Sequence, residues 1–118
     1  MMMKNSIEEN IQYYLAAWNA KERQVIKANL EKCLSADGTY TDKNTRTLKG
    51  LEAFTDLIVH SYDKMPEREF SVTSALDHFD NKGRYYWRVT FPNKDAKDGM
   101  DYIEYNEENK ITAIVGFV

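Results

Sequence analysis

The sequence contains almost no cysteine, since Cys33 is the single one among 118 residues. One cysteine cannot form an internal disulfide, and this usage is typical of proteins from a reducing compartment. No histidine lies near Cys33 in the sequence, so a small buried hydrophobic side chain is favoured over a nucleophile. We therefore expect a cytoplasmic protein without disulfides.

Clusters of basic residues and long apolar runs are also missing. Lys and Arg total 16 against 19 Asp and Glu, which gives a net charge of −3 and no basic face for phosphate groups. Residues 1–5 are followed by polar residues, so neither a signal peptide nor a membrane span is expected. These features exclude nucleic acid and membrane as expected partners.

The familiar motifs of metal and nucleotide chemistry do not occur. Two distant histidines and one cysteine do not form a zinc set. No G-x-S-x-G elbow, P-loop or G-x-G-x-x-G sequence is present. We expect no metal and no cofactor.

What the chain does contain is enough apolar material for one packed core. Hydrophobic residues make up 42% and aromatic residues 13% of the sequence, more than a disordered chain would have. A length of 118 residues is typical of one domain, and no linker or repeat divides it. We expect a single domain over residues 1–118.

Helical spacing of apolar residues predicts helices over residues 5–19, 21–34 and 50–64. Ser6 and Glu9 have the spacing of a capping box at the start of the first helix. Tyr14 falls on the apolar face of that helix, where its hydroxyl needs a polar partner. His60 falls on the polar side of the third helix and is expected to be solvated.

Strand-like patterns cover a short segment at 39–42 and most of the chain after residue 69. Residues 43–49 read as a polar loop, 70–78 as one strand, 84–91 as another, and 92–98 as a connection. Residues 100–105 and 111–118 read as a hairpin around a polar turn. The order predicts an α+β fold, with three N-terminal helices packed on a curved, mostly antiparallel sheet that encloses a conical cavity.

The parity of the strands places an acid on the core side of this sheet. Asp101 shares a strand face with Ile103 and Tyr105, and Tyr40 shares one with Asp42. A carboxylate there is costly unless it lines a cavity or is paired. Asp101 is therefore expected in a cavity, or in a buried network with His78 or Arg84.

Several stretches, in their order and spacing, resemble the SnoaL-like branch of the nuclear-transport-factor-2-like superfamily. They are YLAAWN at 14–19, ADGTYTD at 36–42, LKGL at 48–51, RYYW at 84–87, MDY at 100–102 and GF at 116–117. The resemblance spans nearly the whole chain. It implies a cone-shaped cavity and a homodimer formed through the outer face of the sheet.

The resemblance also implies a catalytic set, because the superfamily includes ketosteroid isomerases and polyketide cyclases. Tyr14, Asp42 and Asp101 occupy what look like the isomerases' functional positions. By analogy, Asp42 would be the base, while Tyr14 and protonated Asp101 would donate to an oxyanion. One departure is Lys43, where relatives often have proline after the aspartate, and its ammonium would favour ionised Asp42.

Ligand contacts are predicted from side chains on the faces that border the expected cavity. Trp87 is expected to pack on a flat apolar ligand, and Trp18 to lie in the core or at the rim. His78 has the parity of the apolar face and would be a core histidine or an acid-base partner of Asp101. The candidate ligand-binding residues are Trp18, Tyr40, Phe54, Ile58, His78, Trp87 and Ile103.

Two functions remain open at this point. The first is a small apolar or aromatic ligand bound in the cone, with cofactor-free isomerase or cyclase chemistry. The second is a non-catalytic ligand-binding or dimerisation module, in which Tyr14 bonds a backbone carbonyl and Asp42 caps the turn at Lys43 and Asn44. The sequence does not name the ligand.

Overall fold

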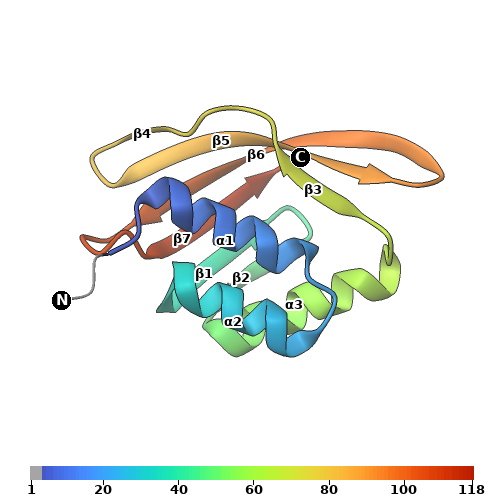
Figure 1. The fold of residues 1–118 in the computed structure, drawn as a ribbon, viewed down its shortest axis with the longest axis horizontal. Coiled ribbons are helices and arrows are strands. Elements are labelled where there is room, and N and C mark those ends of the chain that lie inside the picture. The colour runs from blue at the N-terminus through green and yellow to red at the C-terminus, as the bar shows by residue number, and fades with distance from the viewer. Residues whose placement is uncertain (1–3) are drawn as a thin grey trace.

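A computed structural model describes residues 4–118, which form three helices and one seven-stranded sheet (Figure 1). The helices are α1 (Ile7–Asn19), α2 (Arg23–Cys33) and α3 (Leu51–Lys64). The strands are β1 (Leu34–Asp42), β2 (Thr45–Lys49), β3 (Glu69–Val72), β4 (Asp77–Phe79), β5 (Lys82–Phe91), β6 (Lys94–Tyr105) and β7 (Ile111–Phe117).

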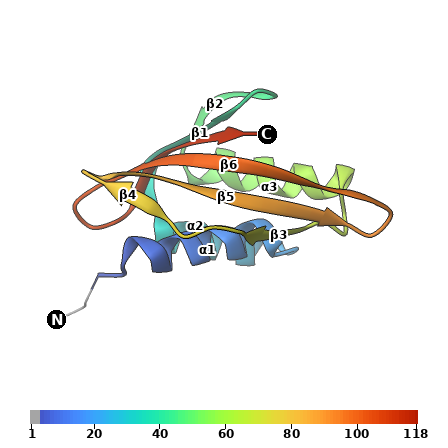
Figure 2. The same cartoon turned by 90° about the horizontal axis from the view of Figure 1, so that it is seen from above.

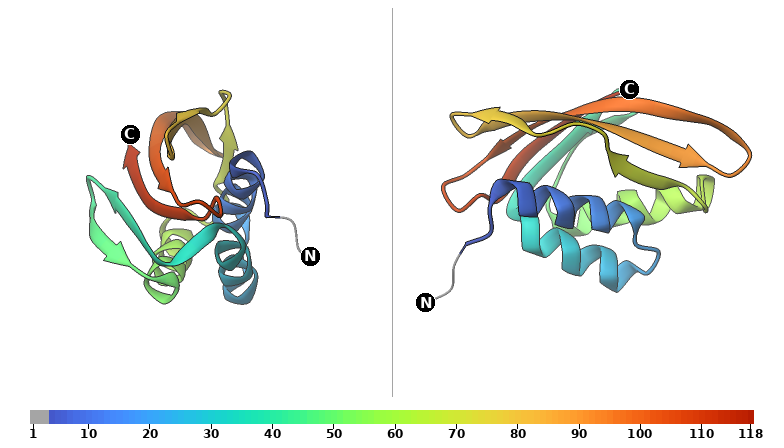
Figure 3. Two further views of the ribbon diagram at one scale, coloured as in Figure 1. Left: turned by 90° about the vertical axis from the view of Figure 1, so that its left-hand side faces the viewer. Right: turned by 45° about the horizontal axis from the view of Figure 1, so that its top comes forward.

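The sheet runs in the order β2-β1-β7-β6-β5-β3, and β4 pairs with β5. Neighbouring strands are antiparallel except β1 and β7, which are parallel, so the sheet is mixed and mostly antiparallel. Figure 2 shows the β1–β2 hairpin at one edge and β3 at the other. The sheet curves, and the helices gather on one side of it (Figure 3).

The helices are not all N-terminal, because β1 and β2 lie between α2 and α3. The Asp37-Gly38 pair, whose residue types favour a turn, lies inside β1. A register irregularity between Leu34 and Thr39 in the pairing with β7 accommodates it. Tertiary pairing therefore overrides the local turn preference of these two residues.

Three further boundaries differ from the sequence-based expectation. The predicted loop at 43–49 is the second arm of a hairpin, in which Thr39 faces Lys49. The predicted single strand at 70–78 divides into β3 and β4, and Tyr86 donates its backbone N–H to the Ser74 hydroxyl in the gap. The predicted connection at 92–98 belongs largely to β6, where Arg88 of β5 pairs with Asp98.

The capping box of α1 is confirmed. The Ser6 hydroxyl accepts from the Glu9 backbone N–H at 3.0 Å, and Glu9 accepts from the Ser6 N–H at 2.9 Å. These bonds satisfy groups that the first helical turn cannot satisfy itself. They fix the start of the helix that carries Tyr14.

The core between helices and sheet centres on the aromatic ring of Phe54, which is fully buried on α3. Its centroid lies 5.0 Å from that of Tyr40, 5.9 Å from that of Tyr14 and 6.3 Å from that of Trp18. Phe54 thus joins α1, α3 and β1 in one aromatic cluster. This cluster forms the support beneath the cavity described below.

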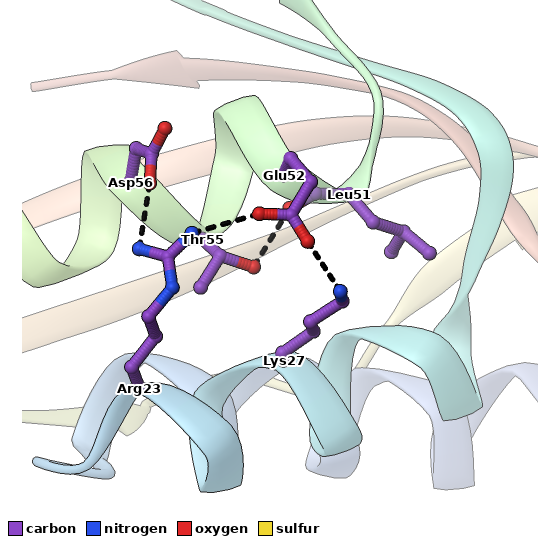
Figure 4. Close-up of polar contacts among 6 residues, drawn as sticks. All are labelled: Arg23, Lys27, Leu51, Glu52, Thr55 and Asp56. Carbon is purple, nitrogen blue, oxygen red and sulfur yellow. Dashed lines mark hydrogen bonds and ion pairs between the residues drawn. The ribbon is translucent and has the colours of Figure 1, made fainter.

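An exposed ionic network connects α2 to α3 (Figure 4). Arg23 pairs with Glu52 at 2.8 Å and with Asp56 at 2.6 Å, and Lys27 also pairs with Glu52. All of these side chains are open to solvent, so screening leaves little net stabilisation. The buried stripe of α2, with Ile26, Leu30 and Cys33, holds the helix in place.

Within the part of the chain that the structure describes, no helix is both long and apolar enough to cross a membrane.

Candidate functional site

A cavity of about 270 Å³ lies between the helices and the inner face of the sheet. Its wall is mostly aromatic and aliphatic, with a few polar groups. The lining residues are Tyr14, Leu15, Trp18, Tyr40, Asp42, Asn44, Thr45, Leu57, Ser61, Met65, Phe70, Tyr85, Trp87, Asp101, Gly116 and Val118. Such a space is of the kind that proteins use for small molecules.

Asp101 is the most deeply placed acid of this cavity, with 6% of its surface exposed. Its Oδ2 accepts a hydrogen bond from the Tyr85 hydroxyl at 2.8 Å, and its Oδ1 accepts one from the Trp87 indole N–H at 3.1 Å. Tyr85 lies opposite Asp101 in the β5–β6 pairing, and Trp87 follows on the same face. Adjacent strands therefore supply both the acid and its donors.

Opposing effects set the protonation of Asp101. Burial penalises the charged form and raises the pKa of Asp101 to about 6, with a smaller contribution from the nearby charge of Asp42. The hydrogen bonds from Tyr85 and Trp87 favour the ionised form and limit this rise. The result is an acid whose charge changes close to neutral pH.

Asp42 is the second acid, at the end of β1, and it is half-buried. Its Oδ2 accepts from the Tyr40 hydroxyl at 2.8 Å, and its Oδ1 accepts from the Asn44 backbone N–H at 2.8 Å. Asp42 thus caps the turn into β2 and lines the cavity as well. Lys43 points elsewhere and contacts the backbone oxygen of Val118.

Gly116 of β7 separates the two acids. A methyl group built on Gly116 would lie 3.3 Å from Asp101 Oδ1, 3.4 Å from the Tyr40 hydroxyl and 3.7 Å from Cβ of Asp42. A methyl group would be tight here, so glycine lets the Asp101 carboxyl group and the Tyr40 hydroxyl keep their positions. Both carboxyl groups and Gly116 line the same cavity.

Tyr14 contributes a donor from the opposite, helical wall. Only 4% of its surface is exposed, and within residues 4–118 its hydroxyl proton has no protein acceptor. Burial and then the charge of Asp101 raise the pKa of Tyr14 well above its ordinary value, so the phenol stays protonated. Among residues 4–118, the hydroxyl of Tyr14 does not make the bond to a backbone carbonyl that the non-catalytic alternative assumed.

The structure brings together the three predicted catalytic side chains, Tyr14, Asp42 and Asp101, at one cavity. Of the predicted ligand contacts, Trp18, Tyr40 and Trp87 also line it.

The other predicted contacts do not line the cavity. Phe54, Ile58 and Ile103 are fully buried and pack one layer behind the wall. On α3, cavity contacts come instead from Leu57 and Ser61. A helix face a few residues wide includes both core and cavity positions, so periodicity alone could not separate them.

His78 lies at the protein surface and away from Asp101. Its ring nitrogens contact the Tyr105 hydroxyl at 2.8 Å and a Glu8 carboxylate oxygen at 3.2 Å. The predicted network of Asp101 with His78 or Arg84 is wrong, since Arg84 pairs with Asp77. The break between β3 and β4 ends the strand parity on which the prediction for His78 depended.

Tyr85 and Phe70 are the main lining residues that the sequence did not single out as site residues. Tyr85 has the same strand parity as Trp87, and this was the available signal. Gly116 carried no signal, because its role depends on side chains from β1 and β6. No group of three or more His, Cys, Asp or Glu side chains that could hold a metal ion gathers within residues 4–118.

The chain was compared with known protein families, sequences and structures. Neither a protein-family model nor a curated protein sequence matches the chain. Among solved structures, a protein from Agrobacterium tumefaciens str. C58, named as an isomerase of the SnoaL-like family, superposes with a TM-score of 0.83 at 26% identity. That match covers 93% of this chain and 94% of the other.

Two more distant structures share the fold. A ketosteroid isomerase-like protein from Catenulispora acidiphila DSM 44928, solved in complex with trimethylamine, has a TM-score of 0.77 at 16% identity, covering 93% of this chain and 85% of that one. A protein from Jannaschia sp. CCS1, named as a SnoaL-like polyketide cyclase, has a TM-score of 0.76 at 11% identity, covering 99% and 88%.

The chain therefore has the fold of nuclear-transport-factor-2-like proteins. Its resemblance to the SnoaL-like members of that superfamily is confirmed by the neighbouring structures.

Proposed function

We propose that the cavity binds a small, largely apolar molecule and that Asp101 exchanges a proton with it. The observation that carries this proposal is a carboxyl group that is buried in the cavity and has a pKa of about 6. A general base works best when its pKa lies near the working pH. Perturbed acids in a cleft are candidates for such chemistry.

The proposed reaction is the isomerisation of a carbonyl compound without a cofactor. Ionised Asp101 takes a proton from the carbon next to the carbonyl group. The electron pair of that C–H bond moves into the enolate, whose oxygen accepts a hydrogen bond from Tyr14. Asp101 then returns the proton to another carbon of the same molecule. The enzyme is regenerated, and the product has the same atoms as the substrate.

Asp42 has a different place in this scheme from the one that analogy gave it. Each acid accepts two hydrogen bonds, but Asp42 is only half-buried, while Asp101 is the acid with the deeper position. We propose Asp101 as the base and Asp42 as a second acid that contacts the ligand. The expected reaction class is kept, with Asp101 in place of Asp42 as the base.

The test is conversion of cyclohex-3-enone to cyclohex-2-enone, followed by ultraviolet absorbance, together with deuterium uptake at the α carbon in D₂O. Asp101→Asn is expected to lower the rate by about 10²-fold or more. The wild-type rate should rise with pH through about 6 and then level off.

Two matched variants locate the base. Asp98→Asn removes an exposed charge from the same strand and should leave the rate unchanged. Asp42→Asn is expected to have the smaller effect of the two cavity variants. An unchanged rate in Asp101→Asn, with loss in Asp42→Asn, would reverse the proposed roles, and no effect in either variant would exclude this chemistry.

A ligand-binding protein without chemistry is the alternative. The trimethylamine complex of the Catenulispora acidiphila protein supports small-molecule binding by this fold. Under this alternative, ligands bind but no deuterium enters any ketone probe.

We also propose a homodimer through the outer face of the sheet. Tyr86 of β5 points away from the cavity and is 51% exposed, which supports this face as a contact surface. Analytical ultracentrifugation should show a dimer that Tyr86→Glu converts to monomer, whereas a monomeric wild type would exclude the proposal.

A further inference from the structure

We propose that the molecule held in this cavity is an organic cation, a small alkylammonium compound that also carries a hydrogen-bond acceptor. This inference rests on the proposed function only in that the cavity is a binding site, and it names the class of ligand. It does not depend on proton transfer.

The charge of the cavity wall is the first reason. Two carboxyl groups, Asp42 and Asp101, line the cavity, and none of its lining residues is Lys, Arg or His. Arg68 does not line the cavity, and it donates to the hydroxyl of the lining residue Ser61 at 2.7 Å. An anionic ligand would meet two acids, while a cation would neutralise them.

The aromatic groups around the acids are the second reason. Rings from Tyr14, Trp18, Tyr40, Phe70, Tyr85 and Trp87 line the same space. The negative faces of such rings attract alkylammonium groups, and the effect grows when water is excluded. Apolar methyl groups on the nitrogen also suit a wall with few polar atoms.

The behaviour of Arg68 illustrates this preference within the same aromatic cluster. Its guanidinium carbon lies 3.7 Å from the ring centroid of Tyr62 and 5.5 and 5.3 Å from those of Trp18 and Phe70. Two rings of the cavity wall, Trp18 and Phe70, thus already attract one cation beside the cavity.

Tyr14 accounts for the second part of the ligand. The Tyr14 side chain lines the cavity, and its hydroxyl donates to no protein acceptor among residues 4–118. A hydroxyl, ether or carbonyl oxygen on the ligand would satisfy it. The ligand class is thus an amine with a nearby oxygen.

The experiment compares two probes of nearly the same shape by isothermal titration calorimetry. Choline carries a trimethylammonium group and a hydroxyl, and 3,3-dimethylbutan-1-ol carries a tert-butyl group in its place. At pH 8 we expect choline to bind at least about tenfold more tightly than the neutral alcohol. Equal binding, tighter binding of the alcohol, or no binding of either probe would overturn the inference.

Two variants with the same change of net charge are compared, one in the cavity and one as its control. Asp101→Asn should remove most of the preference for choline while keeping affinity for the alcohol. Asp98→Asn, on the exposed part of the same strand, should keep the preference. Loss of preference in both variants would indicate a general charge effect and contradict the proposal.

The preference should also depend on pH. Asp101 faces Tyr85 of β5, Tyr14 of α1, and Tyr40 and Asp42 of β1, and the three phenols stay protonated at neutral pH. As the pH falls below about 6, Asp101 gains a proton, so choline affinity should fall while that of the alcohol stays constant. A choline affinity that does not change with pH would argue against contact with Asp101.

These outcomes are separable from those of the proposed chemistry. Tight choline binding without ketone isomerisation would leave a cation-binding protein and exclude the enolisation. Ketone isomerisation with equal affinity for both probes would support the enolisation and exclude the preference for a cation.

Discussion

Asp101→Asn is expected to change how the stability of the protein depends on pH. The unfolding free energy of the variant, relative to that of the wild type, should be higher at pH 8 than at pH 4. In the folded protein the pKa of Asp101 is about 6, above its ordinary value of 3.8. The folded state therefore binds the proton more tightly than the unfolded chain does. Stability from this group is complete below about pH 4 and is lost as the pH rises through 6.

The size of this effect follows from the shift of about two pKa units, at roughly 1.4 kcal/mol each. The difference in unfolding free energy, variant minus wild type, should increase by about 3 kcal/mol from pH 4 to pH 8. Urea denaturation at a series of pH values measures it. Acids that do not interact with Asp101 contribute equally to both proteins and cancel in the difference.

Asparagine suits this position because its oxygen can accept from Trp87 while its amide donates to the Tyr85 oxygen. Asp98→Asn provides the reference, since the pKa of Asp98 is lowered by its pairing with Arg88 and the trend with pH is reversed. A difference for Asp101→Asn that stays flat with pH would show that Asp101 titrates normally. The proposed base would then lose its main support.

Gly99→Ala is expected to displace the Trp87 ring from the cavity wall. Gly99 lies opposite Trp87 in the β5–β6 pairing, and a methyl group there would lie 2.2 Å from Cζ2 of the indole. No contact that short is tolerated, so the ring must move. Overpacking of this kind typically destabilises a protein by about 1–3 kcal/mol.

Movement of the indole would also break its hydrogen bond to Asp101. That bond favours the ionised form, so its loss should raise the pKa of Asp101 further. The pH at which catalysis or choline binding is half-maximal should shift upward. Near-ultraviolet circular dichroism would report the change around Trp87 directly.

A double-mutant cycle separates this clash from the general cost of alanine in the strand. Phenylalanine at position 87 lacks the outer indole atoms that the new methyl group would meet. In the Trp87→Phe background, Gly99→Ala should therefore cost clearly less than in the wild type. Equal costs in both backgrounds would mean that the ring does not restrict position 99.

The two donors that hold Asp101 also explain why this acid can be buried at all. An unpaired carboxylate in an apolar cavity would be costly, and two short hydrogen bonds offset part of that cost. The part of the burial cost that these bonds do not offset appears as the raised pKa of Asp101. Support and tuning of the acid thus come from the same pair of side chains.

Much of the fold could be predicted from patterns that depend only on neighbours in the sequence. Apolar periodicity located all three helices, and Trp87 and Asp101 were expected on the inner face of the sheet. The capping box at Ser6 and the turn at Asp42 are local hydrogen-bond patterns that the residue types specify. The resemblance to SnoaL-like proteins added the expectation that Tyr14, Asp42 and Asp101 meet.

The sequence by itself determined which side chains could face inward, because a strand has a period of two and a helix one of 3.6. Only the tertiary structure decided that Phe54, Ile58 and Ile103 fill the core while Gly116 lies beside the Asp101 carboxyl group. It also set the partners of Asp101 and removed His78 from the site. Burial and pKa depend on groups brought together from distant parts of the chain, and no local pattern encodes those distances.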